Sequence, residues 1–393
     1  MAQPKNEAFV KPELLAWARE DAGLTLEDAA KRIGVKAERL QACEQGESRL
    51  TVNQLRALSN VYKRPLAFFY LPQPPPKTVT LRDFRRLPDE GVESESPKLK
   101  HEIRRAKYRR QVALSLFDEL GEAPPAFTAN TTPSAKPDDV ARQIRGLLNI
   151  TPEEQYQFAS EYEALNRWRS AVEDQGVLVF QASGIKRSEM RGFSITEYPL
   201  PVIVINNKDL PQGRMFSMMH ELAHIMLRMG GLCNLEEKQE IEVFCNMVAG
   251  AALVPEENLL SERIVKESGP REEWSDLVIK SLARRYVVSR EVILRRLLIA
   301  GYTTQEFYRR KREQYRKEYE GREQKTGGSG GGPPPDVMAV SFAGRAFVQL
   351  VLESFHQRRI TASDVSDYLE ISPKHVKNVE RLVQNPTLEL GAA

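Results

Sequence analysis

The sequence predicts a multi-domain, mainly α-helical protein that contains one small β-sheet. Its 393 residues exceed the length of one ordinary domain, so two or three domains are expected. Two short apolar runs, 176–181 (GVLVFQ) and 202–206 (VIVIN), have the pattern of buried strands, whereas helical spacing prevails over much of the chain. Proline- and glycine-rich segments interrupt the chain at residues 72–77, 121–137 and 326–336.

These interruptions predict five successive segments. Residues 1–75 are expected to form a helical domain, 76–137 a basic helical connector, 138–325 a domain of helices around a small sheet, 326–336 a Gly/Pro linker, and 337–393 a helical C-terminal domain. Within the connector, residues 98–110 contain seven basic side chains and one acid, Glu102. We interpret this run as a solvated helix face in preference to a phosphate-binding surface, because like-charge runs are usually exposed.

Composition narrows the class of protein. The chain is 41% hydrophobic and 28% charged with a net charge of +3, which is typical of a globular protein and gives no bulk attraction to nucleic acid. Cys43, Cys233 and Cys245 are too few for a disulfide framework and fit a reducing compartment. Neither an 18-residue apolar run nor a hydrophobic signal core near residue 1 is present, so we expect a cytoplasmic protein without a membrane partner.

The N-terminal segment has the signals of a compact helical module. Thr25 is expected to cap a helix together with Asp28, and Gly34 is expected at the turn that follows. Leucine and valine residues at helical spacing then close a five-helix core. The helix at residues 36–44 would project a recognition surface for the major groove, made of Lys36, Ala37, Arg39 and Gln41.

The segment 24–58, with LTLEDAAKRIGV, CEQGESRLT and LRALSNVY, resembles the Xre-like, lambda-repressor-type helix-turn-helix domain. The resemblance implies a DNA partner, but residues 1–60 hold nine basic and nine acidic side chains, and Glu38 lies on the reading helix. A protein-interaction module is therefore the alternative, and a homodimer would help such a neutral domain to hold phosphates. Residues 279–297 and 361–382 also resemble helix-turn-helix units, although generic helical hairpins give similar patterns.

A metal site is predicted by the pattern HExxH in MFSMMHELAHIML. His220 and His224 are four residues apart, so on a helix both imidazoles reach one tetrahedral cation such as Zn²⁺. Glu221 is then placed to take a proton from a water at the metal's open position. With five histidines in the chain, coincidence is a poor explanation for this spacing.

A third protein ligand is expected, and the sequence limits its identity. The metzincin extension is excluded because Leu227 and Gly230 stand where a glycine and a histidine would be needed. A carboxylate downstream is the natural alternative. The candidates are Glu236, Glu237, Glu240 and Glu242. Glu242 is favoured because it shares a helix face with the small residues Cys245, Asn246 and Ala249, which allow close packing.

The stretches RMFSMMHELAH and EVFCNMVAGAALVP resemble the ImmA/IrrE family of zinc metallo-endopeptidases, over roughly residues 138–298. The resemblance implies that Glu242 is the third zinc ligand, with Glu240 as its main competitor. Two positions depart from the family pattern: Cys245 stands for the usual alanine and Val248 for a usual phenylalanine. Cys233 and Cys245 could contact the metal, but buried packing is the favoured interpretation.

The resemblance further implies a fold of helices around a small sheet and an enzyme that cleaves Xre-type repressor proteins to switch on stress or mobile-element genes. The leading hypothesis is therefore a zinc endopeptidase tethered to a DNA-binding module, acting on such a repressor or on its own N-terminal region. The alternatives are a DNA-binding regulator whose peptidase-like part only senses a ligand or partner, and an antitoxin-like interaction protein. For residues 337–393, substrate docking, oligomerisation and structural capping all stay open.

Overall fold

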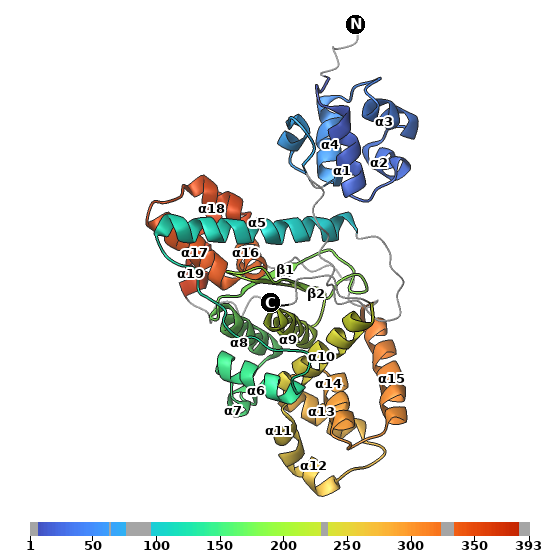
Figure 1. Cartoon of the computed structure of the whole chain (residues 1–393), viewed down its shortest axis with the longest axis vertical. Coiled ribbons are helices and arrows are strands. Elements are labelled where there is room, and N and C mark those ends of the chain that lie inside the picture. Colours follow the sequence, from blue (N-terminus) through green and yellow to red (C-terminus); the bar gives the residue numbers. More distant parts are fainter. Residues whose placement is uncertain (1–6, 63, 76–95, 229–234, 324–333, 385–393) are drawn as a thin grey trace. The chain divides into compact units, whose positions relative to one another are not determined.

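The computed structural model describes residues 7–62, 64–75, 96–228, 235–323 and 334–384. The chain divides into two compact units, the first extending to residue 105 and the second beginning at residue 106 (Figure 1). Within the described ranges no single helix combines the length and apolarity that a membrane crossing needs, although the bent pair Pro335–Ala343 and Arg345–His356 meets that test as a pair by length and composition.

The first unit is a small helical bundle. Its elements are α1 (Pro12–Asp21), α2 (Leu26–Ile33), α3 (Ala37–Glu44), α4 (Val52–Tyr62) and the 3₁₀ helix η1 (Leu66–Tyr70). The expected cap is confirmed, because the Thr25 side chain accepts the N–H of Asp28, and Gly34 ends α2 in the left-handed conformation with φ 69°. The fifth helix of the core is η1, whose Phe68 and Phe69 pack against Tyr62 and Trp17.

Helix α5 (Pro97–Leu120) contains the basic run predicted from the sequence, and much of that run is engaged inside the protein. In the first unit, Arg104 donates to the Asp21 carboxylate at 2.9 Å and Lys100 to the Asp21 carbonyl at 2.7 Å. In the second unit, Arg109 and Arg110 are buried. The interpretation as a solvated face is therefore wrong for these side chains, because carboxylates and carbonyls of other elements pair with them.

The second unit is built around a three-stranded sheet, β1 (Leu178–Ala182), β2 (Gly192–Ile195) and β3 (Val202–Asn206), in the order β1-β3-β2. β1 and β3 are parallel and in register from Leu178↔Val202, whereas β2 is antiparallel to β3. All three strands are buried along their length. β1 and β3 are the strands expected from the sequence; β2 has only four residues and was not expected.

Helices cover this sheet (Figure 1). The helices before and after it are α6 (Pro137–Leu148), α7 (Pro152–Gln155), α8 (Glu161–Glu173), α9 (Pro211–Leu227), α10 (Leu235–Leu253), α11 (Glu256–Ser261), α12 (Arg263–Ser268), α13 (Asp276–Arg285), α14 (Arg290–Ile299) and α15 (Gln305–Glu323). α9 packs on β2 and β3 and against α8 and α10. The largest apolar cluster surrounds it, so α9 is the central helix of the unit.

The C-terminal helices are α16 (Pro335–Ala343), α17 (Arg345–His356), α18 (Ala362–Leu369), the 3₁₀ turn η2 (Pro373–His375) and α19 (Val376–Gln384). α16 packs against β1, and α17 packs against α8. Arg169 on α8 donates to the Ser341 carbonyl at 2.7 Å and also to the Val179 carbonyl of β1. The C-terminal helices therefore cover β1, an edge strand of the sheet.

Candidate metal centre

Helix α9 carries the HExxH residues into the centre of the second unit. Proline lies in its first turn, every residue from Met215 to Leu227 is buried, and His220, Glu221 and His224 are 0%, 1% and 8% exposed. The two imidazoles lie on one face, as the four-residue spacing requires, with their Nε2 atoms 3.1 Å apart. Two buried imidazoles at this separation define a common point in space.

Glu242 of α10 reaches the same point. Its Oε2 lies 3.2 Å from the Nε2 of His220, and its Oε1 lies 3.2 Å from the Nε2 of His224. Among the described residues, this is the group of three metal-ligating side chains whose ligand atoms lie within 4.8 Å of one another. Ligands held about 2.0–2.1 Å from a tetrahedral ion are about 3.3 Å apart, close to the separation of the two Nε2 atoms and of each Nε2 from one Glu242 oxygen, so the three side chains fit a zinc ion.

The electrostatics of the three side chains are strongly coupled. Burial alone would raise the pKa of Glu242, but hydrogen bonds and charge from His220 and His224 lower that pKa well below its usual range. For His224 the directions are reversed. Burial alone would lower its pKa, but the neighbouring Cys245, Glu242 and Glu221 together raise that pKa well above 6.5. The site therefore favours positive charge, which either protons or a bound cation can supply.

Glu221 is held by strand β2. The hydroxyl of Ser194 donates to Glu221 Oε2 at 2.8 Å, and both side chains are buried. Gly192, two residues earlier, faces the other carboxylate oxygen: a Cβ there would lie 3.3 Å from Oε1 and 3.2 Å from the Val204 carbonyl. The short strand β2 thus provides both the contact that orients the carboxylate and the space beside it.

Sequence reasoning missed Ser194 and its strand. The segment Gly192–Ile195 (GFSI) has no continuous apolar run, and a serine on a buried strand is an unusual residue. The available signal was the alternation of Phe193 and Ile195 with two small residues, which is the period of a strand.

The other residues considered for the site lie as follows. Glu240 is exposed, whereas Glu242 is half-buried and in contact with both histidines. The side chains of Glu236 and Glu237, and the whole of Cys233, lie outside the described residues. Cys245 is a buried free thiol whose pKa is raised by burial. Away from the centre, His356 lies 3.2 Å from Glu380 and His375 is half-buried.

The residues expected to read DNA are on the surface of the first unit. Lys36, Arg39 and Gln41 are exposed, and Ala37, the first residue of α3, is half-buried. α3 turns its other face inward, with Leu40 and Cys43 in the core. The helix therefore presents polar side chains outward, as a recognition helix does.

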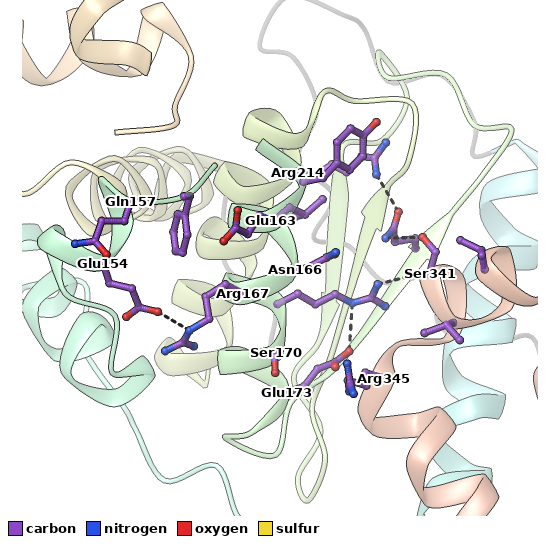
Figure 2. Close-up of a pocket in the computed structure, with 17 residues that line it drawn as sticks. Glu154, Gln157, Glu163, Asn166, Arg167, Ser170, Glu173, Arg214, Ser341 and Arg345 are labelled. Atoms are coloured by element: carbon purple, nitrogen blue, oxygen red, sulfur yellow. Dashed lines mark hydrogen bonds and ion pairs between the residues drawn. The ribbon is translucent and has the colours of Figure 1, made fainter. Parts of the chain in front are cut away.

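The second unit also has a cavity of about 620 Å³ between α8 and the C-terminal helices (Figure 2). In Figure 2, Glu154 and Gln157 lie on one side of the lining and Ser341 and Arg345 on the other, with Glu173 next to Arg345. None of the metal-site residues lines it. The cavity is therefore separate from the candidate metal centre.

Comparison with known proteins matches two parts of the chain. Residues 172–298 match the IrrE N-terminal-like domain of the peptidase M78 family, and residues 13–67 match a helix-turn-helix domain. The first range includes β1 to α14 and all four residues of the candidate centre. No curated protein matches the chain.

Proposed function

From a chain that carries an IrrE N-terminal-like peptidase domain behind a helix-turn-helix domain, we propose a zinc-dependent endopeptidase coupled to a DNA-binding module. The observation that carries the proposal is the convergence of His220, His224 and Glu242 on one point, with Glu221 adjacent to it on the same helix. Two imidazoles and a carboxylate form a ligand set that zinc peptidases use. We assign the metal to these three residues and the general base to Glu221.

A zinc ion in this ligand set supplies Lewis-acid chemistry, lowering the pKa of water towards about 7 and polarising a carbonyl. The chain's own residues supply proton transfer. The Glu221 carboxylate takes the proton of the attacking water and later gives it to the leaving amine. The Ser194 hydroxyl holds Oε2 at 2.8 Å, so we assign the proton transfer to Oε1, beside Gly192.

Strand β2 is the edge at which we expect the substrate to bind. It is the last strand of the sheet, and the Asn206 N–H donates to the Arg191 carbonyl at 2.9 Å. Because hydrogen-bonded and non-bonded pairs alternate in an antiparallel ladder, the backbone groups of Gly192 and Ser194 point away from β3. An extended peptide can pair with such an edge, and this one passes beside Glu221.

The proposed substrate is a repressor-type, Xre-like protein or the chain's own N-terminal region, and its cleavage would control transcription in a stress or mobile-element response. The exposed Lys36, Arg39 and Gln41, together with Ala37 at the start of α3, would bring the enzyme to DNA. A homodimer would double the phosphate contacts of this module. We place this activity in the cytoplasm, where such repressors act.

The decisive experiment incubates the zinc-loaded full chain with a purified Xre-type repressor and analyses the products by mass spectrometry. We expect cleavage by the wild type and a loss of about 10²- to 10⁴-fold in the Glu221→Gln variant, which should still bind zinc. Glu240→Gln, on the same helix as Glu242 but exposed, is the matched control and should retain both activity and metal. Metal analysis of His220→Ala should show loss of zinc.

The alternative is a DNA-binding regulator, or an antitoxin-like interaction protein, whose peptidase-like domain only senses a ligand or partner. The helix-turn-helix domain favours this reading, because it is compatible with regulation that needs no catalysis. If the wild type binds a specific operator but leaves itself and every repressor intact, with Glu221→Gln behaving identically, the endopeptidase proposal fails and the alternative holds.

A further inference from the structure

We propose that α17, α18 and α19 form a second helix-turn-helix module, and that the outer face of α19 binds double-stranded DNA. This site is separate from the reading helix of the first unit and from the metal centre. It lies in the C-terminal helices, to which the proposed function assigns no role.

The turn between α18 and α19 has the same local structure as the turn between α2 and α3. A threonine caps the first helix in each case, Thr25 accepting the N–H of Asp28 and Thr361 that of Asp364. Eight helical residues follow, and then one residue in the left-handed conformation. In both turns the next backbone N–H returns to the carbonyl five residues earlier at 3.0 Å, from Val35 in one and Ile371 in the other.

The residue in the left-handed conformation is a glycine in the first hairpin, Gly34 with φ 69°, and a glutamate in the C-terminal hairpin, Glu370 with φ 56°. A non-glycine residue is disfavoured in this region, so the left-handed conformation at Glu370 costs free energy that the rest of the fold offsets. An extended N-cap residue follows in both hairpins, Lys36 with ψ 148° before α3 and Ser372 with ψ 147° before the 3₁₀ turn η2. The two backbone paths therefore agree through the turn and differ after it, because α3 begins at Ala37 whereas η2 precedes α19.

The buried positions correspond as well. Each residue of the first hairpin is matched by the residue 336 positions later, as Thr361 follows Thr25. Ala29 and Val365 are buried in their first helices, and Leu40 and Val376 are buried in their second helices. α17 packs against α18 and α19, so the hairpin rests on a third helix as a helix-turn-helix requires.

The C-terminal hairpin has exposed polar side chains where such a fold reads DNA. From the N-cap of η2 along the outer face of α19, the exposed side chains are Ser372, Pro373, Lys374, Lys377, Asn378 and Arg381, and His375 is half-buried. The nearby acidic residues either contact basic side chains or lie on another helix. Glu380 is 3.2 Å from His356, Glu370 is 3.6 Å from Arg109, and Asp367 is on α18. The outer face of α19 is therefore basic, whereas α3 carries Glu38 on its outer face.

The third hairpin, α13 and α14, has a similar turn but differs from the C-terminal hairpin in the exposure of its second helix. It has a left-handed residue at its turn, Val287 with φ 52°, and its Val288 N–H also returns to the carbonyl five residues earlier, at 2.9 Å. Its second helix, however, is buried on most sides, including Ile293, Leu294 and Arg296. α14 is thus a core helix without an exposed polar face, whereas α19 has one.

Duplex DNA fits the outer face of α19 better than a protein surface does. Three exposed cations, Lys374 of η2 with Lys377 and Arg381 of α19, match the phosphates on either side of a major groove. Asn378 stands among them, and an asparagine side chain can bind both the N6 and N7 atoms of adenine. Apolar side chains, which a protein partner would need, are confined to the inner face of α19.

The test uses the full chain in which Lys36, Arg39 and Gln41 are replaced by alanine, so that the reading helix of the first unit no longer contributes. Binding to a fluorescein-labelled mixed-sequence DNA duplex of about 20 base pairs is followed by anisotropy over a salt series. In this background we compare two triple replacements by alanine. One removes Lys374, Lys377 and Arg381; the control removes the exposed Lys266, Lys280 and Arg284 of α12 and α13.

We expect the background chain to bind the duplex, and the α19 triple to weaken binding about tenfold or more and to lower the salt slope by about 2–3. The control triple should change affinity less than about threefold. Selection from a random-sequence duplex pool should yield an adenine preference that Asn378→Ala abolishes while the salt slope stays the same.

Three outcomes would overturn the inference. They are a background chain that binds no duplex, equal losses in the two triple variants, and an α19 triple that loses binding to a poly-glutamate peptide but not to DNA. Because all six replaced side chains are exposed, thermal unfolding should be unchanged in both variants, and the comparison stays interpretable. Cleavage of a repressor plays no part in this readout.

Discussion

Replacing Glu173 by alanine should destabilise the second unit, because this side chain links α8 to the C-terminal helices. Glu173 is buried, and its Oε1 accepts from the Arg169 guanidinium at 3.2 Å. Its Oε2 accepts the backbone N–H of Ala346, in the first turn of α17, at 3.2 Å. One carboxylate therefore balances a buried cation and caps a helix from a distant part of the chain.

The magnitude follows from these two contacts. Leaving one member of a buried ion pair without its partner costs about 3–5 kcal/mol. Losing the acceptor at a helix N-terminus costs about 0.5–2 kcal/mol, and the two effects overlap because they involve one side chain. Arg169 keeps its bonds to the carbonyls of Ser341 and Val179. We therefore expect a loss of about 3–5 kcal/mol in the free energy of unfolding.

Urea unfolding measures this loss through the fluorescence of Trp168, which is buried on α8 close to the pair. With a slope near 3 kcal/mol/M, the midpoint should fall by about 1–1.7 M. The double replacement Arg169→Met with Glu173→Leu removes both charges and should be more stable than Glu173→Ala. The reasoning is refuted if Glu173→Ala stays within about 1 kcal/mol of the wild type, or if the double variant is the less stable of the two.

Three further predictions concern the same unit. Gly344→Ala should destabilise by at least about 2 kcal/mol, because φ is +81° and the new Cβ would lie 2.6 Å from the Val179 carbonyl; an unchanged urea midpoint would contradict this. Ser194→Ala should lower kcat about tenfold or more by releasing Glu221, with zinc content unchanged and Ser194→Thr restoring activity; equal kcat values in steady-state assays would refute it. Zinc affinity should fall as the pH decreases through the pKa of His224, because a ligand histidine must be neutral and this pKa is raised above 6.5. A constant zinc affinity down to pH 6.5, measured by competition with a chelator, would refute this prediction.

The local signals in the sequence predicted much of the architecture. Capping at Thr25, the turn at Gly34 and the apolar runs 176–181 and 202–206, which form β1 and β3, are set by residues close together in the chain, so they could be predicted directly. The spacing of His220 and His224 depends only on helix geometry. The roles of these histidines, of Glu221 and of Glu242 stay predictions, although the structure brings His220, His224 and Glu242 together, with Glu221 on the same helix as the histidines.

The features that the sequence could not reveal depend on long-range contacts. Ser194 meets Glu221 across 27 residues, and Ala346 meets Glu173 across 173 residues. Burial of Arg109 and Arg110 depends on carboxylates and carbonyls supplied by other elements, such as Glu197. A charge run has no local property that distinguishes an exposed face from one that is paired inside the protein.

The attachment of the C-terminal helices to β1 also has a consequence for biosynthesis. Phe180 of β1 packs edge-on against Phe347, with ring centres 5.8 Å apart, and the Arg169 guanidinium is satisfied in part by the Ser341 carbonyl. A ribosome must therefore add more than 160 residues after α8 before the partners of this apolar and charged surface exist. During that interval β1 lacks this cover, and exposed apolar surface of this kind is what chaperones bind and proteases recognise.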